Sequence, residues 1–313
     1  MVINSKLYGN SVVWHNLVND CLTNRVAHAY IFSGTKGIGK LLMAKEYIKY
    51  ILKANDVLSQ RIDDDSFLDL LYISKQDKSE IGIDLIRKAG DFFNHTAVEG
   101  NEKFVIIDSA DDLNRNAANA LLKFLEEPAK NTYLFLISHS VKKLLPTIRS
   151  RCRIIKFSPL TVKDLKLLFP EYNISIMEDY IAGSVGRAQI VNEREIVKLY
   201  ERILNLIDNY GIIEFNNFAE LITKNNDQWM LVKDLLIYLI NRCLKFISNK
   251  HDNMMELELS VLEKLANKKS VEEWFKVYDE LFTMFNQTDI YNLDKRQALL
   301  ISIDSIKENK IQE

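Results

Sequence analysis

Residues 34–40, with the sequence Gly-Thr-Lys-Gly-Ile-Gly-Lys, have the composition of a loop that binds phosphate. They follow the apolar segment 28–33 and precede residues 41–51, in which apolar side chains recur at helical spacing. A buried strand, a glycine-rich loop and a helix N-terminus together direct backbone N–H groups at phosphate oxygens. We therefore predict a nucleotide-binding loop with the candidate ligands Gly34, Gly37, Gly39 and Lys40.

The residue after Lys40 departs from this pattern. The motif places serine or threonine there because the hydroxyl binds Mg²⁺, whereas this chain has Leu41. Without that oxygen, metal-assisted cleavage of a phosphate bond loses one fixed contact. Two interpretations remain open at this point. Either residues 34–40 only shape the turn between strand and helix, or they retain residual binding of ATP or ADP.

An acidic residue closes a second apolar segment. Residues 103–108 form an apolar run that ends in Asp108, as is typical of a central strand in a parallel sheet. The following Ser109 cannot act as a general base near neutral pH without a partner, and the sequence shows none. Asp111 lies three residues beyond the strand end, and we do not expect it to replace a base.

Basic residues are concentrated between positions 142 and 156. They are Lys142, Lys143, Arg149, Arg151, Arg153 and Lys156. Their spacing alone indicates a solvated basic face or a modest attraction to the phosphates of nucleic acid. The net charge of the whole chain is −2, which predicts no general attraction to nucleic acid.

The totals describe a globular protein with much helix. A chain of 313 residues exceeds one ordinary core and predicts two or three domains. Hydrophobic residues make up 47% and charged residues 27%, while 10 glycines and 4 prolines are few for a loop-rich all-β fold. We find no secretory signal and no apolar run near the ~20 residues of a membrane span, so we expect a cytoplasmic protein.

The three cysteines, Cys21, Cys152 and Cys243, are far apart and form no CxxC pair. Neither a zinc ribbon nor a disulfide framework can therefore be read from them. The polar stretch 56–80 contains the acidic run 63–65, which we expect to be solvated.

Alternating strand and helix patterns predict an α/β domain followed by a helical region. We expect strands at 28–33, 103–108 and 133–137, and helices at 12–22 and 116–125. Pro128 ends the last of these helices. Further short helices are expected at 161–169 and 174–182, and the chain from about 193 onward has an almost wholly helical pattern with apolar stripes at 229–247 and 271–285.

The order of these features resembles the clamp-loader family of AAA+ proteins, and most closely its delta-prime branch in bacterial DNA polymerase III. The resemblance depends on residues 34–40, on 108–111, on the Leu-Leu-Pro-Thr-Ile run 144–148 and on Ser-Arg-Cys at 150–152. It implies a RecA-like AAA+ core with a parallel sheet over 1–158, including a strand at 68–73 and a helix at 83–93. A small helical lid over 159–200 and a C-terminal helical collar over 201–313 would follow.

The same resemblance assigns roles to four residues. Arg151 matches the arginine finger that a clamp-loader subunit offers to ATP on the adjacent subunit, and a guanidinium suits this role because it forms paired hydrogen bonds to phosphate oxygens. Asp108 matches the acid that orients Mg²⁺ and its water. Ser138 and Arg187 match the two positions that sense phosphate. The family's catalytic glutamate is replaced by Ser109.

The resemblance therefore implies an ATPase-deficient subunit of a pentameric ring that helps load the sliding clamp onto primed DNA. Its expected partners are the gamma/tau and delta subunits, the sliding clamp and, through the complex, primed DNA, with no membrane involved. We expect no required cofactor and no zinc, because residues 56–80 lack the four cysteines of the family's zinc module. The chain would belong to a polymerase holoenzyme without being an active polymerase or ATPase itself.

Two alternatives compete with this prediction. One is a catalytic, gamma/tau-like clamp-loader ATPase, against which Leu41 and Ser109 argue. The other is a P-loop kinase, which would explain residues 34–40 but not residues 150–152 or the helical C-terminal third.

Overall fold

The structure is a computed structural model that describes residues 9–75, 79–170, 177–193, 196–209, 211–249 and 253–307. The chain divides into two compact units. Unit 1 contains the residues up to 171 and residues 182–188, and unit 2 contains residues 172–181 and those from 189 onward. The three-part division with boundaries at 158 and 200 stays a prediction.

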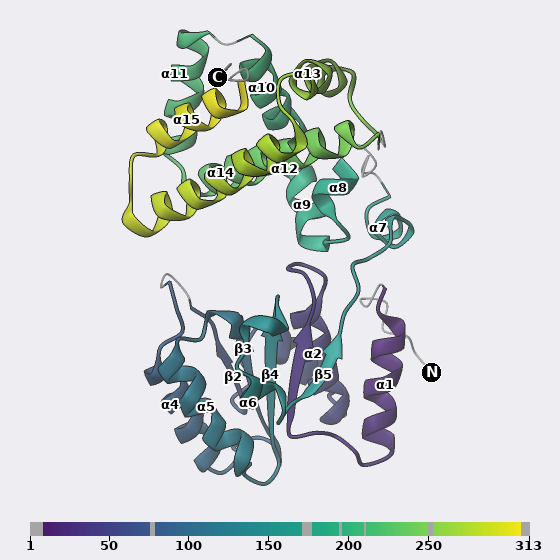
Figure 1. Ribbon diagram of the computed structural model, residues 1–313. Helices are drawn as coiled ribbons and strands as arrows, with labels where there is room; N and C mark the ends of the chain where they lie inside the picture. The colour runs from purple at the N-terminus through teal and green to yellow at the C-terminus, as the bar shows by residue number, and fades with distance from the viewer. Residues whose placement is uncertain are drawn as a thin grey trace. The chain divides into compact units, whose positions relative to one another are not determined.

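Unit 1 is built on a sheet of five parallel strands in the order β2-β3-β4-β1-β5 (Figure 1). The strands are β1 (Ala29–Ser33), β2 (Leu70–Ile73), β3 (Lys103–Asp108), β4 (Thr132–Ser138) and β5 (Arg153–Lys156). Because helices cover both faces of a parallel sheet, its central strands are apolar on both sides, and this is the pattern that the sequence shows. The four predicted strands and the parallel sheet are confirmed, whereas β5 was not predicted.

Helices cover both faces of this sheet. One face carries α4 (Ile83–Asn94), α5 (Arg115–Glu126) and the short α6 (Pro146–Arg149), which share a core with side chains such as Ile31 and Val105. The other face carries α2 (Lys40–Ile51), which contacts α1 (Ser11–Leu22) and α3 (Asp56–Asp63). Aromatic rings fill this second core, and the rings of Tyr30 and Phe135 stack with centroids 5.4 Å apart.

The acidic run 63–65 is not simply solvated. Asp63 forms an ion pair with Lys49 at 2.6 Å, and Asp65 forms one with Lys45 at 2.8 Å. Asp64 and Asp65 are exposed, as expected, whereas Asp63 is only partly exposed, because two lysines on one face of α2 lie beside the end of α3. The predicted strand 68–73 is present as the shorter β2.

Unit 2 is helical throughout its described residues. Its helices are α8 (Glu178–Ile181), the later part of α9 (Val185–Glu193), α10 (Ile196–Asp208), α11 (Ile212–Thr223), α12 (Asn226–Ile247), α13 (Glu256–Ala266), α14 (Val271–Tyr291) and α15 (Lys295–Lys307). The long helix α12 lies at the centre and contacts α10, α11, α13, α14 and α15. This confirms the helical C-terminal region. The predicted helix 161–169 is α7 (Val162–Leu168) of unit 1, whereas part of the predicted helix 174–182 lies outside the described residues.

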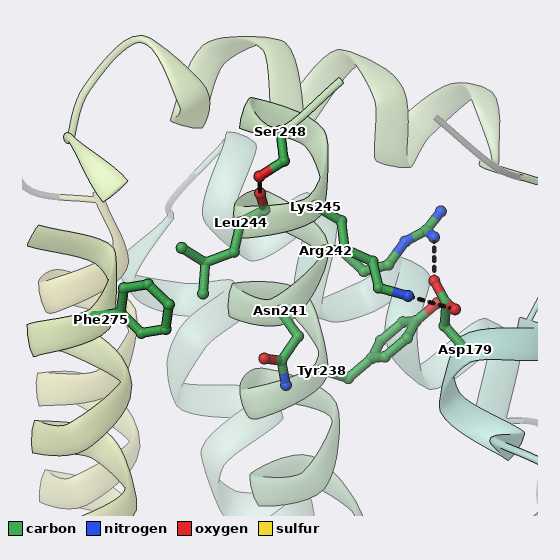
Figure 2. A pocket seen from close by; sticks show the side chains of 8 residues that line it. All are labelled: Asp179, Tyr238, Asn241, Arg242, Leu244, Lys245, Ser248 and Phe275. Carbon is green, nitrogen blue, oxygen red and sulfur yellow. Dashed lines mark hydrogen bonds and ion pairs between the residues drawn. The ribbon is translucent and has the colours of Figure 1, made fainter. Parts of the chain in front are cut away.

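A buried ionic network joins three helices of unit 2. Arg242 of α12 donates from Nε to Glu258 of α13 at 2.8 Å and from Nη1 to Asp179 of α8 at 2.7 Å. The hydroxyl of Tyr200 in α10 also donates to Glu258, at 3.0 Å. Lys245 donates to the second oxygen of Asp179 at 2.6 Å, and Figure 2 shows Asp179 between Arg242 and Lys245. Arg242 and Glu258 are 2% and 0% exposed, so each would be a buried charge without a counter-ion if the other were removed.

The exposure of the two basic partners of Asp179 predicts very different contributions to stability. We expect Arg242→Ala to lower the free energy of unfolding by about 3–5 kcal/mol, because it leaves Glu258 as an unpaired buried charge. Lys245→Ala is the matched control, since its side chain is 45% exposed and its ion pair should contribute less than about 1 kcal/mol. Urea unfolding followed by circular dichroism measures both. Equal losses for the two variants would contradict this account.

Candidate functional site

Because the strands run in the same direction, several predicted site residues lie at one edge of the sheet. Strands β1, β3 and β4 are parallel neighbours, with Ser33 opposite Ser138 and Asp108 opposite Ile137. The carboxyl ends of these strands therefore meet at the same edge, and residues 34–40 leave β1 there. We call it the carboxyl edge.

The glycines of residues 34–40 have the conformation that the motif requires. Gly37 and Gly39 have φ of +80° and +87°, in the left-handed region that other residues rarely adopt. Gly37 also accepts a hydrogen bond from the backbone N–H of Gly186 at 3.2 Å, and a Cβ at Gly37 would lie 2.2 Å from Oγ of Ser184. The first turn of α9 thus packs against the loop and brings the exposed Arg187 to this part of unit 1.

The side chain of Lys40 is buried and satisfied within the protein. Its Nζ donates to the carbonyl oxygens of Gly34 and Thr35, each at 2.6 Å, and lies 3.1 Å from Nδ1 of His139. Lysine has three N–H donors, so these three acceptors use all of them. A phosphate that approached Lys40 would have to compete with two backbone carbonyls and an imidazole.

Burial and neighbouring charges shift the protonation of this pair. Burial lowers the pKa of Lys40 to about 8, against the opposing effect of Asp108 and Asp111. Burial and then repulsion from Lys40 lower the pKa of His139 below its usual value. Near pH 7 the lysine is therefore mostly protonated and the histidine neutral, as is required if Nδ1 of His139 accepts a hydrogen bond.

Both carboxylate oxygens of Asp111 are engaged by donors. Oδ1 accepts from the hydroxyl of Ser138 at 2.9 Å and from the backbone N–H of Ser140 at 3.2 Å. Oδ2 accepts from the hydroxyl of Ser109 at 2.9 Å and from the backbone N–H of His139. Asp111 therefore ties the short helix after β3 to the loop after β4, and this gives it a structural role. The hydroxyl of Ser138 is directed at Asp111 within this network.

Asp108 ends β3 and accepts a hydrogen bond from the hydroxyl of Tyr72 at 3.2 Å. Leu41 lies in the first turn of α2, directly after Lys40. The structure thus gathers the loop, Asp108 and Ser138 at the carboxyl edge. Their roles toward a nucleotide stay predictions.

Arg151 lies at the opposite edge of the sheet. Strand β5 runs parallel to β1 and begins with Arg153 opposite Tyr30, near the amino end of β1. Arg151 precedes β5 by two residues, so it lies beyond the amino ends of the strands. Its exposed side chain donates to the carbonyl of Thr147 at 3.1 Å and forms an ion pair with Glu126 at 2.9 Å. This ion pair was not predicted, because nothing in the local sequence links α5 to residue 151.

Most of the other basic residues of this stretch are exposed, as the solvated-face interpretation expects. Arg153 forms an ion pair with Asp20 of α1 at 2.6 Å. Lys142, Lys143 and Lys156 are exposed. Burial raises the pKa of Cys152 to about 12, so its thiol stays protonated near neutral pH and packs as a small apolar group.

Two pockets lie away from residues 34–40. A pocket of about 430 Å³ in unit 2 is lined by residues of α12 with Asp179 and Phe275 (Figure 2). Its two basic side chains, Arg242 and Lys245, are both paired with Asp179, so it presents no free cation to an anionic ligand. A second pocket, of about 610 Å³, lies between α1 and α2. No sequence motif indicated either pocket.

The described part of the chain holds no group of three or more His, Cys, Asp or Glu side chains placed to bind a metal ion. The expected absence of zinc stays a prediction. Within the described ranges, none of the helices combines the length and apolarity that a membrane crossing requires.

Comparison with known proteins gives relatives that are named as subunits of DNA polymerase III. Residues 9–161 match the family model described as DNA polymerase III, delta subunit. The chain is 37% identical to the DNA polymerase III subunit delta' of Bacillus subtilis over 205 residues, which are 59% of this chain and 62% of that protein. It is 38% identical to the delta' subunit of Pseudomonas aeruginosa, over 51% of this chain and 53% of that protein. The chain thus spans between half and two thirds of these two relatives.

Two further similarities extend over most of the chain. It is 27% identical to the DNA polymerase III subunit gamma of Buchnera aphidicola, over 94% of this chain and 84% of that protein. The crystal structure of a gamma subunit-related protein from Thermotoga maritima covers 94% of this chain and 99% of that one, with a TM-score of 0.55 and 17% identity. This likeness concerns the fold. It confirms the RecA-like AAA+ core with a helical C-terminal region.

The contact between Lys40 and His139 predicts a measurable titration. We expect the pKa of His139 to lie below its ordinary value of 6.5 and to rise in the Lys40→Met variant, because the variant removes a nearby positive charge. Lys36→Met is the matched control, since the exposed Lys36 has the weakest of the stated effects on His139 and should produce a smaller rise. NMR titration of the five histidines measures these shifts. An unchanged His139 in Lys40→Met would contradict the contact.

Proposed function

We propose that this chain, whose residues 9–161 match the family model described as DNA polymerase III, delta subunit, is a delta-prime-type subunit of a clamp loader. In this role it is an ATPase-deficient member of a ring that loads the sliding clamp onto primed DNA. It presents Arg151 to ATP bound by an adjacent subunit. The curated delta' relatives support this proposal over the part of the chain that they match.

The position of Arg151 is the observation that carries the proposal. Arg151 lies beyond the amino ends of the strands, while residues 34–40 lie at the carboxyl edge. The five residues of β1 separate the two edges by roughly 16 Å. The exposed guanidinium therefore cannot serve the chain's own loop, and a phosphate that it contacts must belong to another molecule. An arginine finger supplied by an adjacent subunit can raise the rate of ATP turnover by ~10³–10⁵-fold.

The chain's own loop supports the ATPase-deficient part of the proposal. Leu41 supplies no oxygen to Mg²⁺, and Ser109 is a buried hydroxyl that donates to Asp111. Lys40 makes its three hydrogen bonds within the protein. We therefore favour the interpretation in which residues 34–40 shape the turn between β1 and α2, so that the subunit requires no bound nucleotide.

A catalytic, gamma-like ATPase is the second candidate. The similarity to the Buchnera gamma subunit over 94% of the chain favours it. Against it stand Leu41 and Ser109, which remove a metal ligand and the base that activates water. Turnover by the isolated chain separates the two candidates, because only the gamma-like ATPase needs it.

The helical unit 2 supplies a surface suited to other subunits. On α14, the side chains of Val271, Phe275, Tyr278 and Phe282 recur at intervals of four, three and four residues. Val271, Phe275 and Phe282 are 37%, 55% and 54% exposed, and the rings of Tyr278 and Phe282 stack. This α14 stripe has the spacing of a helix–helix seam. We propose that it takes part in a collar with the gamma/tau and delta subunits.

The trans role is tested with the assembled clamp loader. Arg151→Ala should lower ATP turnover at the adjacent site by about 10³-fold, as seen in lower DNA-stimulated turnover and clamp loading by the complex. Arg151→Lys should recover little, because an ammonium lacks the paired donors of a guanidinium. The isolated wild-type chain, assayed with Mg²⁺ and ATP, should show no turnover.

Assembly of each variant is checked by gel filtration before turnover is compared. Unchanged turnover in a fully assembled Arg151→Ala complex would refute the trans role. Robust turnover by the isolated chain would instead favour the gamma-like ATPase.

If the α14 stripe contacts other subunits, a charged residue in it should weaken assembly of the clamp loader. Phe282→Asp should weaken co-purification with the partner subunits by at least about tenfold, because it places a charge in an apolar seam. Val57→Asp is the control, since Val57 is 70% exposed on α3 of unit 1 and lies outside the stripe. Equal retention of both variants would exclude this surface from the collar.

A further inference from the structure

We infer that Glu126 is a positioning residue that orients Arg151 for the adjacent subunit, an inference that rests on the proposed function. Glu126 ends α5, and Arg151 follows α6, 25 residues later in the chain (151 − 126). Oε1 of Glu126 lies 2.9 Å from Nη2 of Arg151. No sequence motif predicted this pairing.

The contacts hold the guanidinium from two sides. Nη2 pairs with Glu126, while Nη1 donates to the carbonyl of Thr147 at 3.1 Å and lies 3.4 Å from Oγ of Ser150. These contacts involve only two of the three nitrogens, and a guanidinium carries five N–H donors. Donors therefore remain for phosphate oxygens while the side chain is held in one orientation.

The backbone under both residues is firmly anchored. Leu121 and Leu125 of α5 are 1% and 3% exposed, and Ile148 of α6 is 1% exposed in the same core. Helices α5 and α6 also contact each other. Packing thus fixes the backbone at Glu126 and Arg151, and the ion pair fixes the guanidinium of Arg151. A change at Glu126 should alter the orientation of Arg151 without altering the fold.

Glu126 could act on Arg151 in two opposite ways. It restricts the many rotamers of a long side chain before the subunits meet, which favours turnover. It also competes with phosphate for the cation, which opposes turnover. The side chain of Glu126 is 51% exposed, so water and salt screen its repulsion of phosphate, whereas the loss of rotamer freedom is not screened. We therefore expect the positioning effect to dominate.

The neighbouring glutamate is a natural control. Glu127 has the same charge, is exposed and lies one position further along the chain. Among the described ion pairs, Arg151 pairs with Glu126. A general effect of negative charge near this surface should therefore appear in both Ala variants, and a positioning effect only in Glu126→Ala.

The experiment measures DNA-stimulated ATP turnover by the assembled clamp loader. Glu126→Ala should lower turnover at saturating ATP by about three- to fivefold, as expected for an exposed ion pair, with an unchanged KM for ATP. Glu126→Gln keeps the length and one acceptor and should lie between wild type and Glu126→Ala. Glu127→Ala should match wild type. Arg151→Ala/Glu126→Ala should match Arg151→Ala alone, because Glu126 acts through Arg151.

Turnover of Glu126→Ala equal to or above that of wild type would overturn the inference, and faster turnover would identify Glu126 as a competitor. Additive losses in the double variant would also overturn it, since Glu126 would then act elsewhere. If Arg151→Ala itself has no effect, the proposed function and this inference fail together. If Arg151→Ala is defective while Glu126→Ala is not, only the inference about Glu126 fails.

Discussion

The parallel direction of all five strands is the constraint on which the rest of unit 1 depends. Because every strand points the same way, the loops that follow the strands emerge at one edge and the segments that precede them lie at the other. The phosphate-type loop and Asp108 are consequently kept apart from Arg151 within one chain. A chain with this sheet cannot bring the two ends of its strands together, so groups at one edge cannot act on groups at the other.

At the carboxyl edge, the polar groups of the predicted phosphate-binding loop and of its neighbours form their hydrogen bonds within the protein. Lys40 donates to two loop carbonyls and His139, and Asp111 accepts from Ser109 and Ser138. Buried polar groups must find partners, and here they find them within unit 1. The amino edge is different, because the contacts of Arg151 are exposed and can be exchanged when another surface arrives.

Unit 2 combines a fixed interior with an accessible surface. The buried pair of Arg242 and Glu258 leaves α12 and α13 little freedom to shift, since separating two buried charges is costly. The α14 stripe, in contrast, presents Phe275 and Phe282 to solvent. This exposed apolar seam is the surface that the proposed collar would use.

The sequence by itself determined the features that depend on neighbouring residues. Apolar runs predicted three of the five strands, the family resemblance added β2, and the spacing of glycines with Lys40 predicted the loop after β1. The absent hydroxyl at Leu41 and the absent carboxylate at Ser109 are also properties of single positions. The strand β5 was missed because it has only four residues and is mostly exposed.

Only the tertiary structure decided which distant residues meet. Several pairings join separate segments of the chain. They are the contact of Lys40 with His139, the ion pairs of Asp63 and Asp65, the contact of Glu126 with Arg151 and the pairing of Asp179 with Arg242. Periodicity along a chain reports which face of an element is buried, but it does not report which side chain lies opposite. That information arises only when the elements pack.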